Sequence, residues 1–156
     1  MKINSATRAQ ITASDARLSS WLTANAGSGK TKVLIDRVAR LLLDGVKPEQ
    51  ILCLTYTKSA AAEMKNRLFD RLGKWAMLAD HELNFSLLEM GIQTHLGIEE
   101  LKKARTLFAR AIEAPGGLKI QTIHAFCSSL LRKFPLEAGI SPQFGELTER
   151  GQRDLY

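Results

Sequence analysis

Residues 24–31 read ANAGSGKT, and they follow the short, partly β-forming stretch SSWLT at residues 19–23. The spacing fits the phosphate-binding pattern G-x-x-x-x-G-K-[ST], with Ala24 in place of the first glycine. Small residues let consecutive backbone N–H groups curve around phosphate oxygens, and the positive end of a following helix points into the same place. The stretch therefore predicts a phosphate cradle between a strand and a helix.

The loop residues differ in what they can offer to a nucleotide. Lys30 can reach the β- and γ-phosphates as a mobile point charge, and the Thr31 hydroxyl can take one position in the oxygen shell of Mg²⁺. We expect these two residues to be catalytic and Thr31 to be the metal ligand. The other loop residues expected to contact the nucleotide are Asn25, Ala26, Gly27, Ser28 and Gly29.

The loop alone leaves its use open. A bare GSGK sequence can also be a turn that starts a helix, although Thr31 and the strand–loop–helix context favour the cradle. Phosphate loops serve kinases, GTPases and motor ATPases alike, so the loop does not select a function. A small-molecule P-loop kinase would also need a lid and a carboxylate for its acceptor, and neither can be located in the sequence.

The rest of the chain alternates helical and strand patterns. The predicted elements after the loop are a helix at 31–45, a strand at 51–57, a helix at 59–72, a strand at 118–124 and a helix at 125–134. In the first helix the apolar positions are 33, 34, 38, 41 and 42, and in the second Glu63 can pair with Arg67. The apolar run at 51–57 predicts a buried strand. Short connections between such strands favour parallel βαβ units, and hence an α/β fold.

Composition and charge set limits on the class of protein. Lys and Arg number 22 against 16 Asp and Glu, a formal charge of +6, which suits a nucleic-acid partner but is also seen in ordinary basic domains. Cys53 and Cys127 lie in apolar runs without a CxxC spacing and are expected to be buried free thiols. With no apolar run near the ~20 residues that span a bilayer and no signal-peptide core, we expect a soluble cytoplasmic protein without membrane contact.

Two later motifs narrow the function. ANAGSGKT, LTYTKSAAAEM and TIHAFC occur in that order, each at a predicted strand-to-helix junction. They resemble motif I, motif Ia and the following DNA-contacting motif of superfamily 1 DNA helicases of the UvrD/RecB group. The spellings ILCLTYTKSAAAEM and APGGLKIQTIHAFC are most similar to the AddA component of AddAB-type helicase–nucleases. The resemblance covers residues 10–144.

The resemblance implies a role for each matching residue. It implies ATP and Mg²⁺ at the loop, with the amide of Gln10 reading the adenine edge. The residues that it implies for DNA binding are Thr55, Tyr56, Thr57, Lys58, Thr122 and His124. Tyr56 replaces the family's phenylalanine, and Lys58–Ser59 replaces Asn-Lys, which moves the positive charge by one residue. From the residues alone, Tyr56 could instead pack in the core and His124 could be structural.

The resemblance also implies an architecture. It is a P-loop NTPase sheet of the RecA-like type, parallel and flanked by helices, with a helical insertion at about residues 76–114 that leaves the sheet. No apolar strand ending in Asp-Glu is found, so residues 1–156 are expected to be an incomplete, truncated N-terminal part of a motor domain without ATP turnover. A nuclease of the AddB type is the implied partner of the full-length protein. A non-catalytic module that binds single-stranded DNA remains an alternative.

Overall fold

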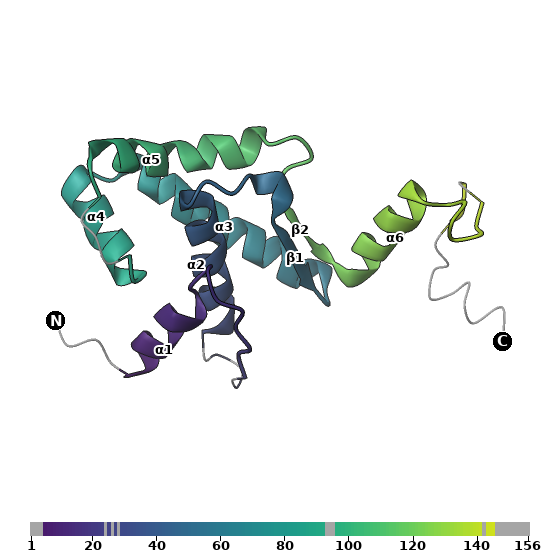
Figure 1. Cartoon of the computed structure of the whole chain (residues 1–156), viewed down its shortest axis with the longest axis horizontal. Helices are drawn as coiled ribbons and strands as arrows, with labels where there is room; N and C mark the ends of the chain where they lie inside the picture. Colours follow the sequence, from purple (N-terminus) through teal and green to yellow (C-terminus); the bar gives the residue numbers. More distant parts are fainter. Residues whose placement is uncertain are drawn as a thin grey trace.

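Amphipathic helices separated by short polar turns make up most of the chain. The computed structural model describes residues 5–23, 25, 27, 29–92, 96–141 and 143–145. The elements are α1 (Ser5–Ala13), α2 (Lys30–Leu43), the 3₁₀ turn η1 (Pro48–Gln50), β1 (Leu52–Thr55), α3 (Lys58–Met77), α4 (Asp80–Glu89), α5 (Ile98–Glu113), β2 (Lys119–Thr122) and α6 (Ile123–Lys133). Figure 1 shows a helical body beside a small sheet, with α6 extending from the sheet.

The sheet of the described chain is a single parallel pair. Leu52 of β1 lies opposite Lys119 of β2, and Thr55 lies opposite Thr122. Parallel strands need a crossover, and here the crossover contains α3, α4 and α5. The register brings the carboxyl ends of both strands to the same edge, where α3 and α6 begin.

Two predictions about strands are wrong. Residues 19–23 form no strand and are irregular, with the Trp21 side chain 94% exposed. A strand is stabilised by pairing with a neighbour, and this stretch pairs with neither β1 nor β2. β1 is not a buried strand either, because Leu52 and Leu54 are exposed. Successive side chains of a strand point to opposite faces, and only the face with Cys53 is packed on the core.

The helices follow the predicted periodicity with adjusted boundaries. The Thr57 side chain caps α3, which runs to Met77 because Trp75 adds a further buried position to the stripe of Met64, Leu68 and Leu72. The predicted Glu63–Arg67 ion pair is present. In α2 the buried stripe is centred on Ile35, Val38, Ala39 and Leu42, whereas Leu34 is exposed. The helix is therefore turned slightly from the face that its apolar positions alone predict.

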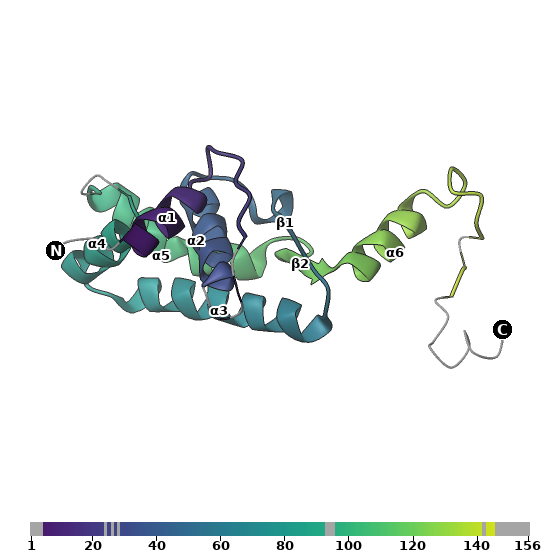
Figure 2. The same ribbon diagram turned by 90° about the horizontal axis from the view of Figure 1, so that it is seen from below.

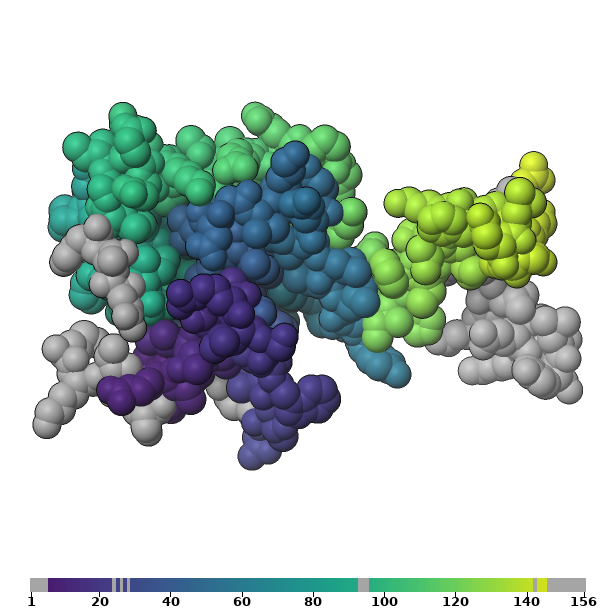
Figure 3. Space-filling model, in the orientation of Figure 1, coloured from purple at the N-terminus to yellow at the C-terminus, as the bar shows by residue number. Residues whose placement is uncertain are grey.

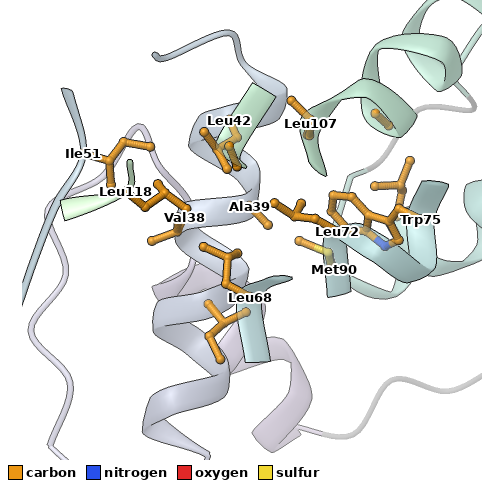
Figure 4. Close-up of a cluster of buried hydrophobic side chains, with 14 of the residues drawn as sticks. Val38, Ala39, Leu42, Ile51, Leu68, Leu72, Trp75, Met90, Leu107 and Leu118 are labelled. Carbon is orange, nitrogen blue, oxygen red and sulfur yellow. The ribbon is translucent and has the colours of Figure 1, made fainter. Parts of the chain in front are cut away.

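One hydrophobic core joins the helical body. Figure 4 shows Ala39 of α2 beside Leu72 of α3, Trp75 next to Leu72, and Leu107 of α5 near Leu42 of α2. The two helices of the expected insertion, α4 and α5, contribute Leu83, Leu87, Leu101, Ala104, Leu107 and Ala111 to this same cluster. Figure 2 shows α3 running along one side of the body. Helices α4 and α5 pair with neither strand, and they share the core of α2 and α3.

Helix α6 contacts the rest of the described chain mainly through the sheet. None of its residues is buried, and Figure 3 shows the helix as a protrusion joined to the body at one end. Cys127 is therefore exposed, and its expected burial is wrong, whereas Cys53 is half-buried. Residues 147–156, where a further helix is conceivable from the sequence, lie outside the described residues. Within the described part of the chain, no helix combines the length and the apolar character needed to cross a membrane.

Candidate functional site

The phosphate loop ends in a left-handed backbone conformation that glycine accommodates best. Gly27 has φ of 79° and Gly29 has φ of 91°, a region that favours glycine over residues with a side chain. Gly29 is the N-cap of α2 and provides no side-chain cap. The first N–H groups of a helix have no partner within the helix, so at this cap they are donors for an anion. Ala26 and Ser28, predicted to contact the nucleotide, lie outside the described residues.

Lys30 folds back toward the loop. Its Nζ donates a hydrogen bond to the backbone carbonyl of Asn25 at 2.6 Å. This contact holds the ammonium group over the loop rather than extended into solvent, and it is one that a phosphate oxygen could replace. Thr31 is half-buried in the first turn of α2. The position and chemistry of both side chains fit a nucleotide phosphate and an oxygen-liganded cation; their roles stay predictions.

Gln10, far from the loop in sequence, lies directly against it. A methyl group added at Gly29 would come within 2.8 Å of the Gln10 Nε2 atom. Gln10 lies in the last turns of α1, and its amide therefore borders the left-handed glycine at the start of α2. The structure thus brings together the amide expected to read adenine and the loop expected to hold phosphates. A second consequence is that the left-handed backbone opposes a side chain at Gly29, and that a side chain there would displace the Gln10 amide.

The two later motifs meet at the carboxyl edge of the sheet. Thr55 and Thr122 are partners in the parallel register. Thr57 Oγ1 accepts a hydrogen bond from the Ala60 N–H at 3.1 Å, and Thr122 Oγ1 accepts one from the Ala125 N–H, also at 3.1 Å. Each motif therefore carries a threonine N-cap at or just after the end of its strand, and two helix N-termini lie at one edge. Such an edge suits the negative phosphates of a nucleic-acid strand.

The side chains expected to contact DNA differ in their exposure. Tyr56 is 81% exposed, so its packing in the core, the alternative from the sequence, is wrong. Lys58 and His124 are exposed as well, whereas Thr55 is half-buried and Thr122 is buried. The exposed aromatic ring and the exposed polar side chains are available to a ligand, while Thr122 contributes mainly by capping α6.

Both predicted sites lie on the same side of the molecule. In Figure 1 the first turn of α2 and the carboxyl end of β1 both lie toward the lower edge of the view. In open α/β sheets ligands bind beyond the carboxyl ends of the strands. The nucleotide and DNA residues are thus arranged along one side, although they come from separate segments of the chain.

Sequence reasoning missed the polar residues of α2. Asp36 is buried and accepts from Arg71 of α3 and from Lys32, one turn away on the same helix. Arg37 and Arg40 donate to backbone carbonyls of α1 and of the turn after it. A polar residue inside an apolar stripe, such as Asp36 between Ile35 and Val38, is the sequence signal that could have indicated a buried pair.

The turn after α1 is itself closed by an ion pair. The Arg17 side chain and backbone N–H both donate to the Asp15 carboxylate. The side-chain hydrogen bond from Arg17 holds the pKa of Asp15 well below its usual range. Elsewhere, burial raises the pKa of the Cys53 thiol and makes it a poor nucleophile at neutral pH.

Comparisons with known proteins agree with the motifs. A family model described as the UvrD/REP helicase N-terminal domain matches residues 3–156. A Lactobacillus acidophilus protein, named as a subunit of an ATP-dependent helicase/nuclease, is 33% identical over 134 residues, which are 86% of this chain and 9% of the relative. An Enterococcus faecalis protein with the same name is 33% identical over 128 residues, 82% of this chain and 8% of the relative. The chain thus spans less than a tenth of the length of these curated relatives.

Proposed function

The chain belongs to the UvrD/REP helicase N-terminal domain family, and from this membership we propose that it is the ATP-binding part of an AddA-type, ATP-dependent DNA helicase. Its sheet would be part of a RecA-like P-loop NTPase sheet. The observation that carries the proposal is the loop geometry: Gly29 is left-handed at the start of α2, Lys30 folds over the loop, and Gln10 lies against Gly29.

The loop residues would divide the binding of ATP and Mg²⁺. Bound ATP supplies the phosphoanhydride whose hydrolysis drives movement along DNA in such motors. Lys30 would exchange the Asn25 carbonyl for a phosphate oxygen, and Thr31 would offer its hydroxyl to the cation. Gln10 would donate to and accept from the adenine edge. These contacts position the nucleotide and neutralise its charge.

Single-stranded DNA would lie across the carboxyl ends of β1 and β2. Tyr56 would stack on a base, which suits binding without sequence preference because every base has a π-face. The N-termini of α3 and α6, with Lys58 and His124 beside them, would face the phosphates. Thr57 and Thr122 would hold this edge by capping the two helices.

The proposal extends to the whole protein, whose relatives are named for an ATP-dependent helicase/nuclease. Such a protein would act in the cytoplasm on DNA ends, in double-strand break repair and recombination, with a nuclease of the AddB type as its partner. The name of the relatives, which combines a helicase and a nuclease in one assembly, supports this extension.

The test separates the nucleotide site from the DNA site. Affinity for a fluorescent ATP analogue with Mg²⁺, and for a fluorescent single-stranded oligonucleotide, is measured for the 156-residue chain and its variants. We expect Lys30→Ala to abolish nucleotide binding and leave DNA binding in place. Tyr56→Ala should weaken DNA binding by about tenfold, because stacking on one base contributes about 1–3 kcal/mol, and leave nucleotide binding unchanged.

Matched controls and a contrary result define the test. Lys74→Ala removes a positive charge near the end of α3, and Phe85→Ala removes an exposed aromatic ring from α4, both away from the proposed sites. Neither should alter either affinity by more than about twofold. Salt-sensitive DNA binding without any nucleotide binding by the wild-type chain would support the non-catalytic DNA module instead.

A further inference from the structure

We propose that Arg37 and Arg40 of α2 are positioning residues that hold Gln10 against the phosphate loop, so that α2 sets the selectivity for adenine. The inference rests on the proposed function, because it deepens the role of Gln10 at the same nucleotide site. Neither arginine is close to Lys30 along α2, since Arg37 follows it by about two helical turns. They act on the base side of the site through α1.

Arg40 holds the last turn of α1. Its Nη1 donates to the Ile11 carbonyl at 3.0 Å and to the Ser14 hydroxyl at 3.0 Å. Ser14 is buried, and its hydroxyl donates in turn to the Ile11 carbonyl at 2.9 Å. The carbonyls at the end of a helix have no partner within it, and a guanidinium both satisfies them and complements the helix dipole. Arg40 therefore takes the place of a C-terminal cap for α1.

Arg37 holds the turn that follows. Its Nη1 donates to the Asp15 carbonyl at 2.7 Å, and its Nη2 donates to the Leu18 carbonyl at 2.6 Å. The planar, two-pronged guanidinium spans both carbonyls, which a lysine ammonium could not do with the same geometry. Together the two arginines fix α1 and its exit turn to the outer face of α2.

Steric contact fixes α1 from another direction. Ile11 packs so closely on Gly91, which has φ of 85°, that a methyl group added there would overlap the Ile11 side chain. Gln10 immediately precedes Ile11, and its amide borders Gly29. Because α2 carries both the loop at its start and the arginines further along, it acts as one rigid element that sets the distance between Gln10 and the loop.

This arrangement predicts an effect on base selectivity rather than on phosphate binding. If Arg37 is removed, the turn after α1 loses its hydrogen bonds from Arg37 at the Asp15 and Leu18 carbonyls, and Gln10 is held at Gly29 less firmly, through the Arg40 contacts alone. The loop, Lys30 and Thr31 are left in place. A residue that only stabilised the fold would weaken binding of every nucleotide to the same degree.

The experiment compares three ligands on the 156-residue chain: ATP, GTP and inorganic triphosphate, each with Mg²⁺ and measured by calorimetry. Wild type should prefer ATP to GTP by about tenfold, the discrimination expected of a bidentate contact to one base. Gln10→Ala should lose this preference and Arg37→Ala should weaken it, with triphosphate affinity changed less than about twofold in both. The Gln10→Ala/Arg37→Ala double variant should show the same ratio of ATP to GTP affinity as Gln10→Ala alone.

Further variants keep the test decisive. Arg37→Lys retains the charge but not the fork, so it should retain only part of the preference, and it serves if Arg37→Ala does not fold. Arg67→Ala, which breaks an exposed pair on α3, should change nothing. An equal loss of affinity for all three ligands in the arginine variants, or an unchanged preference for ATP over GTP, would overturn the inference. Nucleotide binding that depends on Lys30 would still support the proposed function. No binding of any of the three ligands by wild type would overturn both.

Discussion

The buried carboxylate of Asp36 offers the sharpest test of how the fold is held. Its side chain is 4% exposed, and it accepts from Arg71 Nη1 and from Lys32 Nζ, the latter at 2.8 Å. Arg71 is 25% exposed, and the same nitrogen also approaches the Met90 sulfur at 3.7 Å. The pair therefore joins α2 to α3 inside the helical body. Asp36→Ala would leave the Arg71 guanidinium largely buried and without its carboxylate.

The size of the effect follows from the burial of each partner. Removing one partner of a buried ion pair costs about 3–5 kcal/mol, and the residual exposure of Arg71 favours the lower end, about 3 kcal/mol for Asp36→Ala. Arg71→Ala should cost less, about 2 kcal/mol, because Lys32 still pairs with Asp36. Lys32 is 50% exposed, and its loss should cost only about 0.5 kcal/mol.

Urea unfolding followed by tryptophan fluorescence measures these differences. Trp75 is buried and Trp21 is almost fully exposed, so a Trp21→Phe background isolates the signal of the core. The expected loss of unfolding free energy is largest for Asp36→Ala, smaller for Arg71→Ala and smallest for Lys32→Ala. The Asp36→Ala/Arg71→Ala double variant should lose less than the sum of the single losses. A loss below about 1 kcal/mol for Asp36→Ala, or equal losses for all three, would refute the reasoning.

Three further perturbations test local geometry. Thr57→Ala should lower the unfolding free energy by about 1 kcal/mol by removing the N-cap of α3, whereas Thr57→Ser should retain it in the same urea assay. Gly29→Ala should cost at least about 1 kcal/mol and weaken ATP binding, because the left-handed backbone and the Gln10 amide both oppose a side chain; unchanged affinity would contradict this. Iodoacetamide at about pH 8 should modify Cys127 before Cys53, as mass spectrometry would show, because Cys127 is exposed while burial raises the pKa of the Cys53 thiol and lowers its thiolate fraction. The difference in modification rate between the two thiols should narrow as the pH rises through the raised pKa of Cys53. Faster modification of Cys53 than of Cys127 would contradict the burial of Cys53.

Features that depend on neighbouring residues in the sequence could be predicted from it. The helix periods, the Glu63–Arg67 pair and the strand-to-helix junctions at Thr55 and Thr122 follow from spacing and propensity, and the structure confirms them. Thr122 both ends β2 and caps α6, whereas at the first junction Thr55 ends β1 and Thr57 caps α3. Threonine is a strand former and a good N-cap, which makes both boundaries readable from the sequence.

Burial and long-range contact could not be predicted in the same way. Leu54 and Cys127 lie in apolar runs but are exposed, because exposure depends on which elements cover a face, and apolar runs do not encode that. The stretch around Trp21 has strand-forming residues but finds no partner strand in the described chain. The contact between Gln10 and Gly29 depends on hydrogen bonds that two α2 arginines make to backbone carbonyls, and no pattern in the sequence of α1 indicates them.

The same helix connects these separate observations. α2 begins at the phosphate loop, holds α1 through Arg37 and Arg40, and is fixed to α3 through the Asp36–Arg71 pair. α3 in turn begins at Thr57, beside Tyr56 at the edge of the sheet. The orientation of α2 on α3 therefore sets the relation between the loop and the strand ends. It follows that Asp36→Ala, which touches neither site, should disturb both, whereas Arg37→Ala should disturb only the base side of the nucleotide site.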